Sequence, residues 1–70
     1  MQSETVKIET PFIRLDALLK FAGAAQTGGE AKLLIQEGGV SVNGERCTQR
    51  GKKLYPGDRA ELDGKTFAVE

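Results

Sequence analysis

The sequence predicts an α+β fold in which two helices from the N-terminal half pack on one side of a small antiparallel sheet of about five short strands. Apolar residues recur at spacings of three and four between residues 11 and 37, which is the helical period. From residue 40 onward they alternate with polar residues, and asparagine–glycine and aspartate–glycine pairs mark tight hairpins. Helices followed by a run of strands favour an arrangement with the helices collected on one face of the sheet.

The chain begins with signals for one strand and one helix. Residues 5–9 are expected to form a strand, because Val6 and Ile8 alternate with polar neighbours. Thr10 and Pro11 then mark a helix start, since threonine caps helix ends and the fixed φ of proline suits the first turn. This helix is expected to run to about residue 22. Its apolar face consists of Phe12, Leu15, Leu18, Leu19 and Ala22, and Phe12 is assigned to the core together with Phe67.

A capping box predicts the start of a second helix. The hydroxyl of Thr27 can accept from the amide of Glu30, whose carboxylate can reach back to the cap amide. Ile35 lies on the apolar face of this helix, whereas Leu33 lies nearly opposite. The helix is therefore expected to contact both the first helix and the sheet, and to end at Gly38.

Four short strands are expected after residue 39. The first alternates at Val40 and Val42 and turns at Asn43-Gly44, the pair that favours a type I′ hairpin. A return strand is expected through Cys47, which is interpreted as a small buried residue. The remaining turn and strand signals lie, in order, at residues 56–58, 60–62, 63–64 and 67–69.

Charge is distributed unevenly along a chain that is neutral overall. Ten basic and ten acidic residues cancel, which removes the usual overall signature of a nucleic-acid-binding protein. By position, however, the net charge is −1 over residues 1–13, +3 over residues 14–53 and −2 over residues 54–70. Residues 46–53 hold four basic side chains and no acidic one. They form either a solvated connecting loop or a local positive surface for phosphate, because charges beyond about 8 Å are largely screened.

Length and residue types exclude several functions. A chain of 70 residues buries only about 60% of its unfolded surface, so we expect one domain over residues 1–70 and no deep substrate cavity. With no histidine and a single cysteine, there is no residue set for a zinc site and no intrachain disulfide. We therefore expect no catalytic residue, no cofactor and no metal. The short apolar runs and the polar first residues predict no membrane segment and no signal peptide, and the cysteine content fits a reducing cytoplasm. A two-layer domain of 70 residues can fold alone, so we expect a monomer.

Four segments carry an ordered series of motifs: RLDALL at residues 14–19, TGGEAK at 27–32, LIQEGGVSVNGE at 34–45 and KLYPGD at 53–58. The series resembles the RNA-binding domain named after small-subunit ribosomal protein four, the S-four domain, over about residues 12–63. Its most specific part is the helix-ending glycine followed by Val-x-Val-Asn-Gly. The TGGEAK segment is similar to the small stand-alone bacterial members, the YbcJ-like proteins.

The resemblance implies an αL motif, in which two helices and the following hairpin grip structured RNA. The expected partner is ribosomal or transfer RNA, with the ribosome as a further possibility. The residues predicted to contact RNA, some of them by position in the family motif and the others from this sequence itself, are Arg14, Lys20, Thr27, Gly28, Gly29, Lys32, Asn43, Arg46, Arg50, Lys52 and Lys53.

Two interpretations remain open for several of these positions. Many larger family members have a Ser-Arg pair where this chain has Gly28-Gly29, so the glycines either admit a phosphate or only accompany the cap with a small-residue packing contact. Asn43 either contacts RNA or only shapes its turn. Tyr55 and Phe21 either offer a stacking face to an unpaired base or belong to the core.

The sequence thus predicts a non-catalytic RNA-binding module. The alternative is a small β-grasp-like protein-interaction module without RNA binding, because Val-Asn-Gly-Glu and Pro-Gly-Asp also occur in such folds. A sulfur carrier of that class needs a C-terminal Gly-Gly, whereas this chain ends Phe-Ala-Val-Glu.

Overall fold

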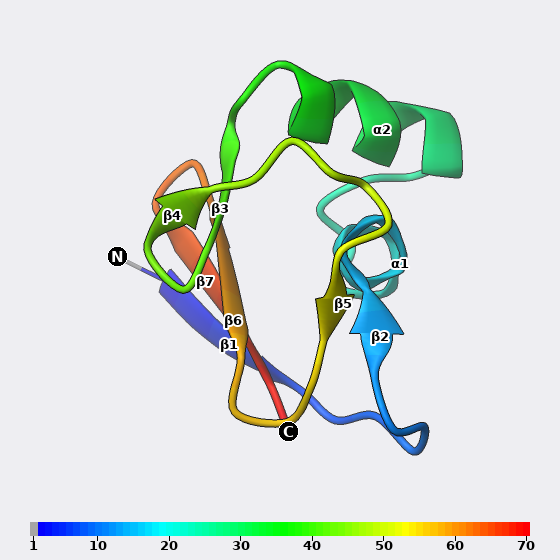
Figure 1. Cartoon of the computed structure of the whole chain (residues 1–70), viewed down its shortest axis with the longest axis vertical. Helices are drawn as coiled ribbons and strands as arrows, with labels where there is room; N and C mark the ends of the chain where they lie inside the picture. Colours follow the sequence, from blue (N-terminus) through cyan, green and yellow to red (C-terminus); the bar gives the residue numbers. More distant parts are fainter. Residues whose placement is uncertain (1) are drawn as a thin grey trace.

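A computed structural model describes residues 2–70. Both helices lie on one side of a five-stranded sheet, and a two-stranded ribbon runs beside the first helix (Figure 1). The α+β class and the placement of the helices are therefore confirmed. The elements are β1 Gln2–Val6, β2 Ile13–Arg14, α1 Leu15–Phe21, α2 Gly28–Gln36, β3 Val40–Val42, β4 Glu45–Arg46, β5 Lys53–Leu54, β6 Arg59–Leu62 and β7 Lys65–Val69.

The main sheet is mixed instead of wholly antiparallel. Its strand order is β1-β7-β6-β3-β4, and the β3–β4, β3–β6 and β6–β7 pairs are antiparallel as expected. The first strand, however, pairs in parallel with the last, with Val6 opposite Val69. Both valines are buried, so this pairing covers an apolar edge of the core with two elements from opposite ends of the sequence. Local patterns contain no information about such a long-range pairing.

The first helix begins later than the sequence predicts. It starts at Leu15, and the preceding residues form β2, in which Ile13 pairs with Leu54 of β5. The hydroxyl of Thr10 donates to the carbonyl of Phe12 (2.7 Å) and caps no helix. Strand pairing against a fully buried leucine outweighs the local signal of threonine followed by proline. As a consequence, Phe12 lies outside the core, and its assignment to the core was wrong.

Four smaller expectations also differ from the structure. The first strand ends at Val6, not at residue 9, because its register is set by β7; Ile8 continues beside it and donates its amide to the carbonyl of Glu70 (3.0 Å). Leu33 is 60% exposed, so α2 contacts its neighbours through one face only. Phe21, at 69% exposure, is outside the core as well, and Cys47 is only partly buried.

Helix caps and tight turns follow the sequence closely. The hydroxyl of Thr27 accepts from the amide of Glu30 at 3.1 Å, which confirms the cap of α2. Asn43 and Gly44 both have positive φ, at 52° and 87°, as a type I′ turn requires. The Asp63-Gly64 hairpin has the same conformation, with φ of 51° and 80°.

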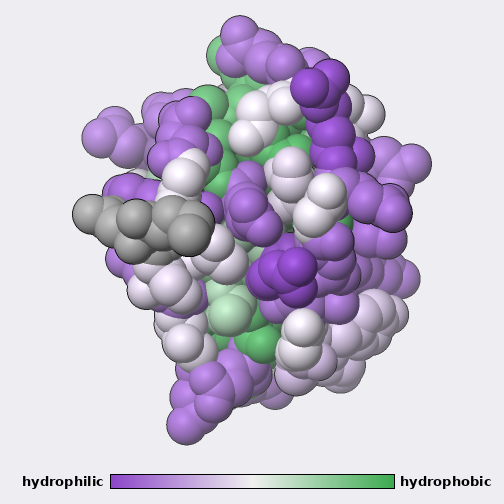
Figure 2. Space-filling model, turned by 90° about the vertical axis from the view of Figure 1, so that its left-hand side faces the viewer, coloured by the Kyte–Doolittle hydropathy of each residue, from purple (hydrophilic) through white to green (hydrophobic). Residues whose placement is uncertain are grey.

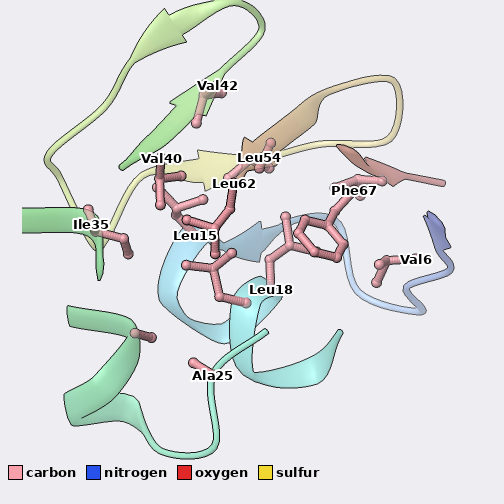
Figure 3. Close-up of a cluster of buried hydrophobic side chains, with 14 residues drawn as sticks. Val6, Leu15, Leu18, Ala25, Ile35, Val40, Val42, Leu54, Leu62 and Phe67 are labelled. Atoms are coloured by element: carbon pink, nitrogen blue, oxygen red, sulfur yellow. The ribbon is translucent and has the colours of Figure 1, made fainter. Parts of the chain in front are cut away.

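The core fills the space between the helices and the sheet (Figure 3). Leu15 and Leu18 of α1 and Ile35 of α2 meet Val40 and Phe67 from the sheet, and all five are almost completely buried. Phe67 thereby takes the core position expected for it. Within residues 3–70 no polar or charged residue is buried, so the groups that carry chemistry lie on the surface.

Candidate nucleic-acid interface

The basic segment that follows the hairpin is fastened to the beginning of α1. The amide of Leu15 donates to the carbonyl of Lys52 (2.8 Å), and the amide of Asp16 donates to that of Arg50 (3.1 Å). These bonds satisfy two amides of the first helical turn, which otherwise lack partners within the helix. Residues 47–52, between β4 and β5, are therefore an ordered strap across the beginning of α1 instead of a free solvated loop.

Arg14 lies directly on this strap. A side-chain carbon at Gly51 would lie 3.5 Å from the guanidinium Nη2 of Arg14, an ordinary contact distance, so the guanidinium lies close to the backbone of the strap. Asp16 accepts from the same nitrogen at 3.3 Å. Half of the arginine side chain remains exposed, so the guanidinium is held in place with donors free to meet an anion.

The ribbon formed by β2 and β5 brings two positive charges face to face. Arg14 lies opposite Lys53 in the antiparallel register, and both side chains are exposed. Like charges in directly opposed positions of a sheet are destabilising. Asp16 offsets the charge of Arg14, whereas the ammonium of Lys53 lies over the ring of Phe12 at 4.9 Å.

A shallow hollow brings Arg14 together with α2. It is lined by Arg14, Asp16, Ala17, Lys20 and Gly28. Arg14 of β2, Lys20 of α1 and the first residue of α2 therefore share one depression. Lys32 is exposed and lies one turn after Gly28 on the same side of α2. Four of the predicted positions thus gather where the two helices and the strap meet.

The two glycines at the start of α2 have open surroundings. A side-chain carbon at Gly28 would meet nothing within 4 Å, and one at Gly29 would meet only the hydroxyl of Thr27 at 3.9 Å. Neither glycine has a positive φ. Around these positions, the structure therefore provides the helix cap but not the small-residue packing contact that was the alternative explanation.

A second hollow lies between the hairpin and the strap. Arg46 and Lys52 line it together with Asn43 and Gln49. The side chain of Arg46 also packs against the end of α2, where a carbon added at Gly38 would lie 3.3 Å from its Cδ. This contact holds Arg46 between the helix and the hairpin.

Figure 2, which views the molecule from the left-hand side of Figure 1, shows a surface that is mostly hydrophilic, with small apolar patches.

Asn43 is engaged within the protein. Its side-chain oxygen accepts from the amide of Arg59 (3.0 Å), and its side-chain nitrogen donates to Asp58 (3.1 Å). Asp58 in turn accepts from the amide of Tyr55 at 2.8 Å. These bonds join the β3–β4 hairpin to the turn between β5 and β6, so Asn43 has a positioning role in the structure.

The same bonds lower the pKa of Asp58 below its ordinary value of 3.8. The amide of Tyr55 has the largest effect, followed by the side chain of Asn43; partial burial opposes them, and the charge of Lys52 adds to them. A lowered pKa in the folded state means that the carboxylate stabilises the fold above its unfolded pKa. That stabilisation disappears as the pH falls through the folded pKa.

We therefore expect Asp58→Asn to reduce stability at pH 7 and to weaken the loss of stability on acidification. Urea unfolding followed by circular dichroism at about pH 7 and about pH 3 measures both effects. Asp63→Asn makes the same charge change in the Asp63-Gly64 turn and is the control. Equal acid sensitivity of Asp58→Asn and the native chain would contradict this assignment.

Among residues 2–70 no three His, Cys, Asp or Glu side chains are grouped so that they could hold a metal ion. No helix in this part of the chain has the length and apolar character needed to cross a membrane. Cys47 Sγ makes one weak contact, to the carbonyl of Gln49 at 3.7 Å.

A comparison with protein families matches residues 6–70 to the model described as "S4 domain". The chain belongs to the S4-domain family. The resemblance to the S-four domain is thereby confirmed, and the match extends beyond residues 12–63 toward both ends. The ribbon, the strap and both helices all fall within this S4 domain.

Two of the proteins that are similar to this S4 domain align with it along most of their length, and a third aligns over a small part of its own. The probable ribosome maturation protein RlbA of Bacillus subtilis is 44% identical over 59 residues, which cover 84% of this chain and 83% of that protein. The putative RNA-binding protein YbcJ of Escherichia coli is 34% identical over 59 residues and 84% of each chain. A tyrosine–tRNA ligase of Nitratidesulfovibrio vulgaris is 45% identical over 42 residues, which are 60% of this chain but only 11% of the ligase.

Sequence reasoning missed two features of this S4-domain surface. Gly51, on which Arg14 lies, was not singled out, and Phe12 was placed in the core. Period-two alternation at Phe12-Ile13-Arg14 and at Lys53-Leu54-Tyr55 is the signal that could have found the ribbon. Each stretch is only three residues long. The first is too short to outweigh the helix-start signal of Thr10 and Pro11 that precedes it.

Proposed function

We propose that this chain is a non-catalytic module that binds structured RNA through phosphate contacts. The observation that carries the proposal is the opposed pair Arg14 and Lys53, held beside an ordered strap that also presents Arg50 and Lys52. Ordered like charges cost stability unless an anion neutralises them. The S4-domain family membership and the name of the relative YbcJ support RNA as that anion.

The proposed interface consists of the hollow lined by Arg14, Lys20 and Gly28, the strap, the β2–β5 ribbon, and Arg46 of the β3–β4 hairpin. Its residues are those expected from the sequence, with Arg14, Lys20, Lys32, Arg46, Arg50, Lys52 and Lys53 meeting phosphates, Gly28 and Gly29 admitting a backbone closely, Thr27 capping α2 and Asn43 positioning the hairpin. Long basic side chains on separate helices and strands can follow the curved phosphate backbone of a folded RNA. Recognition is therefore expected to depend on RNA shape more than on base sequence.

We propose ribosomal or transfer RNA as the ligand. One relative is named as a ribosome maturation protein, and another as a ligase of transfer RNA that shares 42 aligned residues with this chain. Both RNA classes offer folded helices with dense phosphate, and they occur together in the cytoplasm, the expected compartment. We further propose that the domain acts as a monomer.

An enzymatic role is not part of this proposal. The relatives that align over most of their length are named as RNA-binding and maturation proteins. The ligase aligns over only 11% of its length, so its reaction does not transfer to this chain.

Direct binding tests the proposal against the alternative of a protein-interaction module. A fluorescently labelled transfer RNA and a labelled ribosomal RNA hairpin are titrated at about 50 mM salt, where phosphate contacts are strong, and anisotropy is measured. Saturable binding to at least one is expected. A folded protein that binds neither RNA would contradict the proposal and leave the protein-interaction module.

A further inference from the structure

The outward face of the β2–β5 ribbon carries aromatic as well as basic side chains. Ile13 and Leu54 form the inner pair of the ribbon, and Leu54 is fully buried. Because side chains alternate along strands, Arg14 and Lys53 lie on the outer face. Beside them, the rings of Phe12 and Tyr55 pack with centroids 5.8 Å apart and planes tilted by 51°. The outer face therefore has a row of two cations next to a row of two rings.

The two rows are joined by direct contact. The Lys53 ammonium lies 4.9 Å from the centre of the Phe12 ring, within the range of a cation–π interaction. Tyr55 is 49% exposed, so much of its ring is open to solvent although Phe12 packs against it. An exposed ring that touches a second ring beside two ordered cations is a surface with both stacking and anion-binding capacity.

The backbone of Tyr55 is held in place before any ligand arrives. Its amide donates to the carboxylate of Asp58 (2.8 Å), and its carbonyl accepts from the amide of Asp58 (2.8 Å). Asn43 holds the same carboxylate from the hairpin (3.1 Å). A ring on a fixed backbone loses little conformational freedom on binding. This turn therefore fixes the backbone of Tyr55 before a ligand binds, so that its exposed ring is preorganised for stacking.

A surface that only gripped phosphates would need cations but no exposed rings. A nucleotide has both parts: its base stacks on an aromatic face, and its phosphate meets a cation. Bases within a duplex are already stacked on one another, so only an unpaired base can use the ring.

We propose that the ribbon binds one unpaired nucleotide of a structured RNA, with the base stacked on Tyr55 and the adjoining phosphate between Arg14 and Lys53. This inference rests on the proposed function and adds to it the class of RNA feature that the site takes, such as a bulge or a loop nucleotide. The charge of the phosphate complements the opposed pair, and the base covers the ring that the fold leaves exposed.

The test uses two RNA hairpins that are identical except for a single bulged adenosine in one of them. The native chain is expected to bind the bulged hairpin about tenfold more tightly, the typical contribution of one base–aromatic stack. Tyr55→Ala should remove this preference, and Tyr55→Phe should keep it. The salt dependence of binding should be unchanged in Tyr55→Ala, because no phosphate contact is lost.

The matched control is Phe21→Ala, which removes another exposed ring from the opposite end of α1, beside β1. It should retain the preference for the bulged hairpin. A 2-aminopurine in place of the bulged adenosine tests the native chain itself, since transfer from the neighbouring RNA bases to Tyr55 changes its fluorescence. Equal affinity of the native chain for both hairpins, with no change in this fluorescence, would overturn this inference while leaving the proposed function intact. Failure to bind either hairpin would count against the proposed function itself.

Discussion

Reversing the charge of Arg50 and Lys53 together, as Arg50→Glu with Lys53→Glu, is expected to abolish binding to structured RNA. The change removes two phosphate contacts and places two repelling carboxylates on the strap and ribbon. A loss of at least about a hundredfold in affinity at low salt is expected. The loss of affinity is measured by fluorescence anisotropy, with the RNA that binds the native chain.

The fold should survive this double change. Both side chains are exposed, and the backbone bond between Asp16 and Arg50 does not depend on the side chain. At position 53 a glutamate would face Arg14, so an opposite-charge pair would replace a like-charge pair. Thermal unfolding is therefore expected to show equal or higher stability. Increased stability with lost binding is the pattern expected if the opposed charges are retained for RNA.

Lys7→Glu with Lys65→Glu is the matched control for this variant. It changes the net charge by the same amount, but Lys7 follows β1 and Lys65 begins β7. These two strands lie at the opposite end of the strand order from β4, after which the strap begins. Its affinity for RNA should fall only a few-fold through long-range electrostatics. An equal loss in both double variants would show that overall charge, and not the proposed interface, controls binding.

Truncation of Leu54, as Leu54→Ala, is expected to have the largest effect on stability. Leu54 is fully buried and is the residue through which β5 is attached to the core. Removing such a side chain costs about 2–5 kcal/mol. A domain of this length has roughly 4–10 kcal/mol of total stability, so the loss is a large share of it. Affinity for RNA should fall with it, because Lys53 and Tyr55 flank this position.

Leu33→Ala makes the same chemical change at a site that is 60% exposed. It should alter the free energy of unfolding by less than about 0.5 kcal/mol. Urea unfolding of both variants, followed by circular dichroism, compares them directly. If Leu54→Ala costs no more than Leu33→Ala, the ribbon is not anchored as the structure describes.

Short-range features of this fold could be predicted from the sequence. Thr27 caps α2, and the Asn43-Gly44 and Asp63-Gly64 turns have the predicted conformation, because each depends on residues within a few positions. The start of α1 could not be predicted, because it depends on the pairing of Ile13 with Leu54, which are far apart in the chain. The parallel β1–β7 pair escaped prediction for the same reason.

The candidate site was predictable in composition but not in arrangement. The basic cluster at residues 46–53 follows from counting charges, whereas its fastening to α1 depends on backbone bonds from Leu15 and Asp16. The opposition of Arg14 and Lys53 follows from the ribbon register, which a three-residue alternation is too short to reveal. Phe12 was misplaced because a helical stripe was extended into residues that form a strand.

The dependence of affinity on salt tests the central claim most directly. If about four phosphates are contacted, log affinity for structured RNA should fall with log salt concentration at a slope of about −3, or roughly fifty-fold between 50 and 200 mM. Neutralising Arg50 and Lys53 as glutamines should reduce the slope to about −1.5, because about two contacts are lost. Affinity that stays flat across this range in the native chain would contradict an interface built on phosphate contacts.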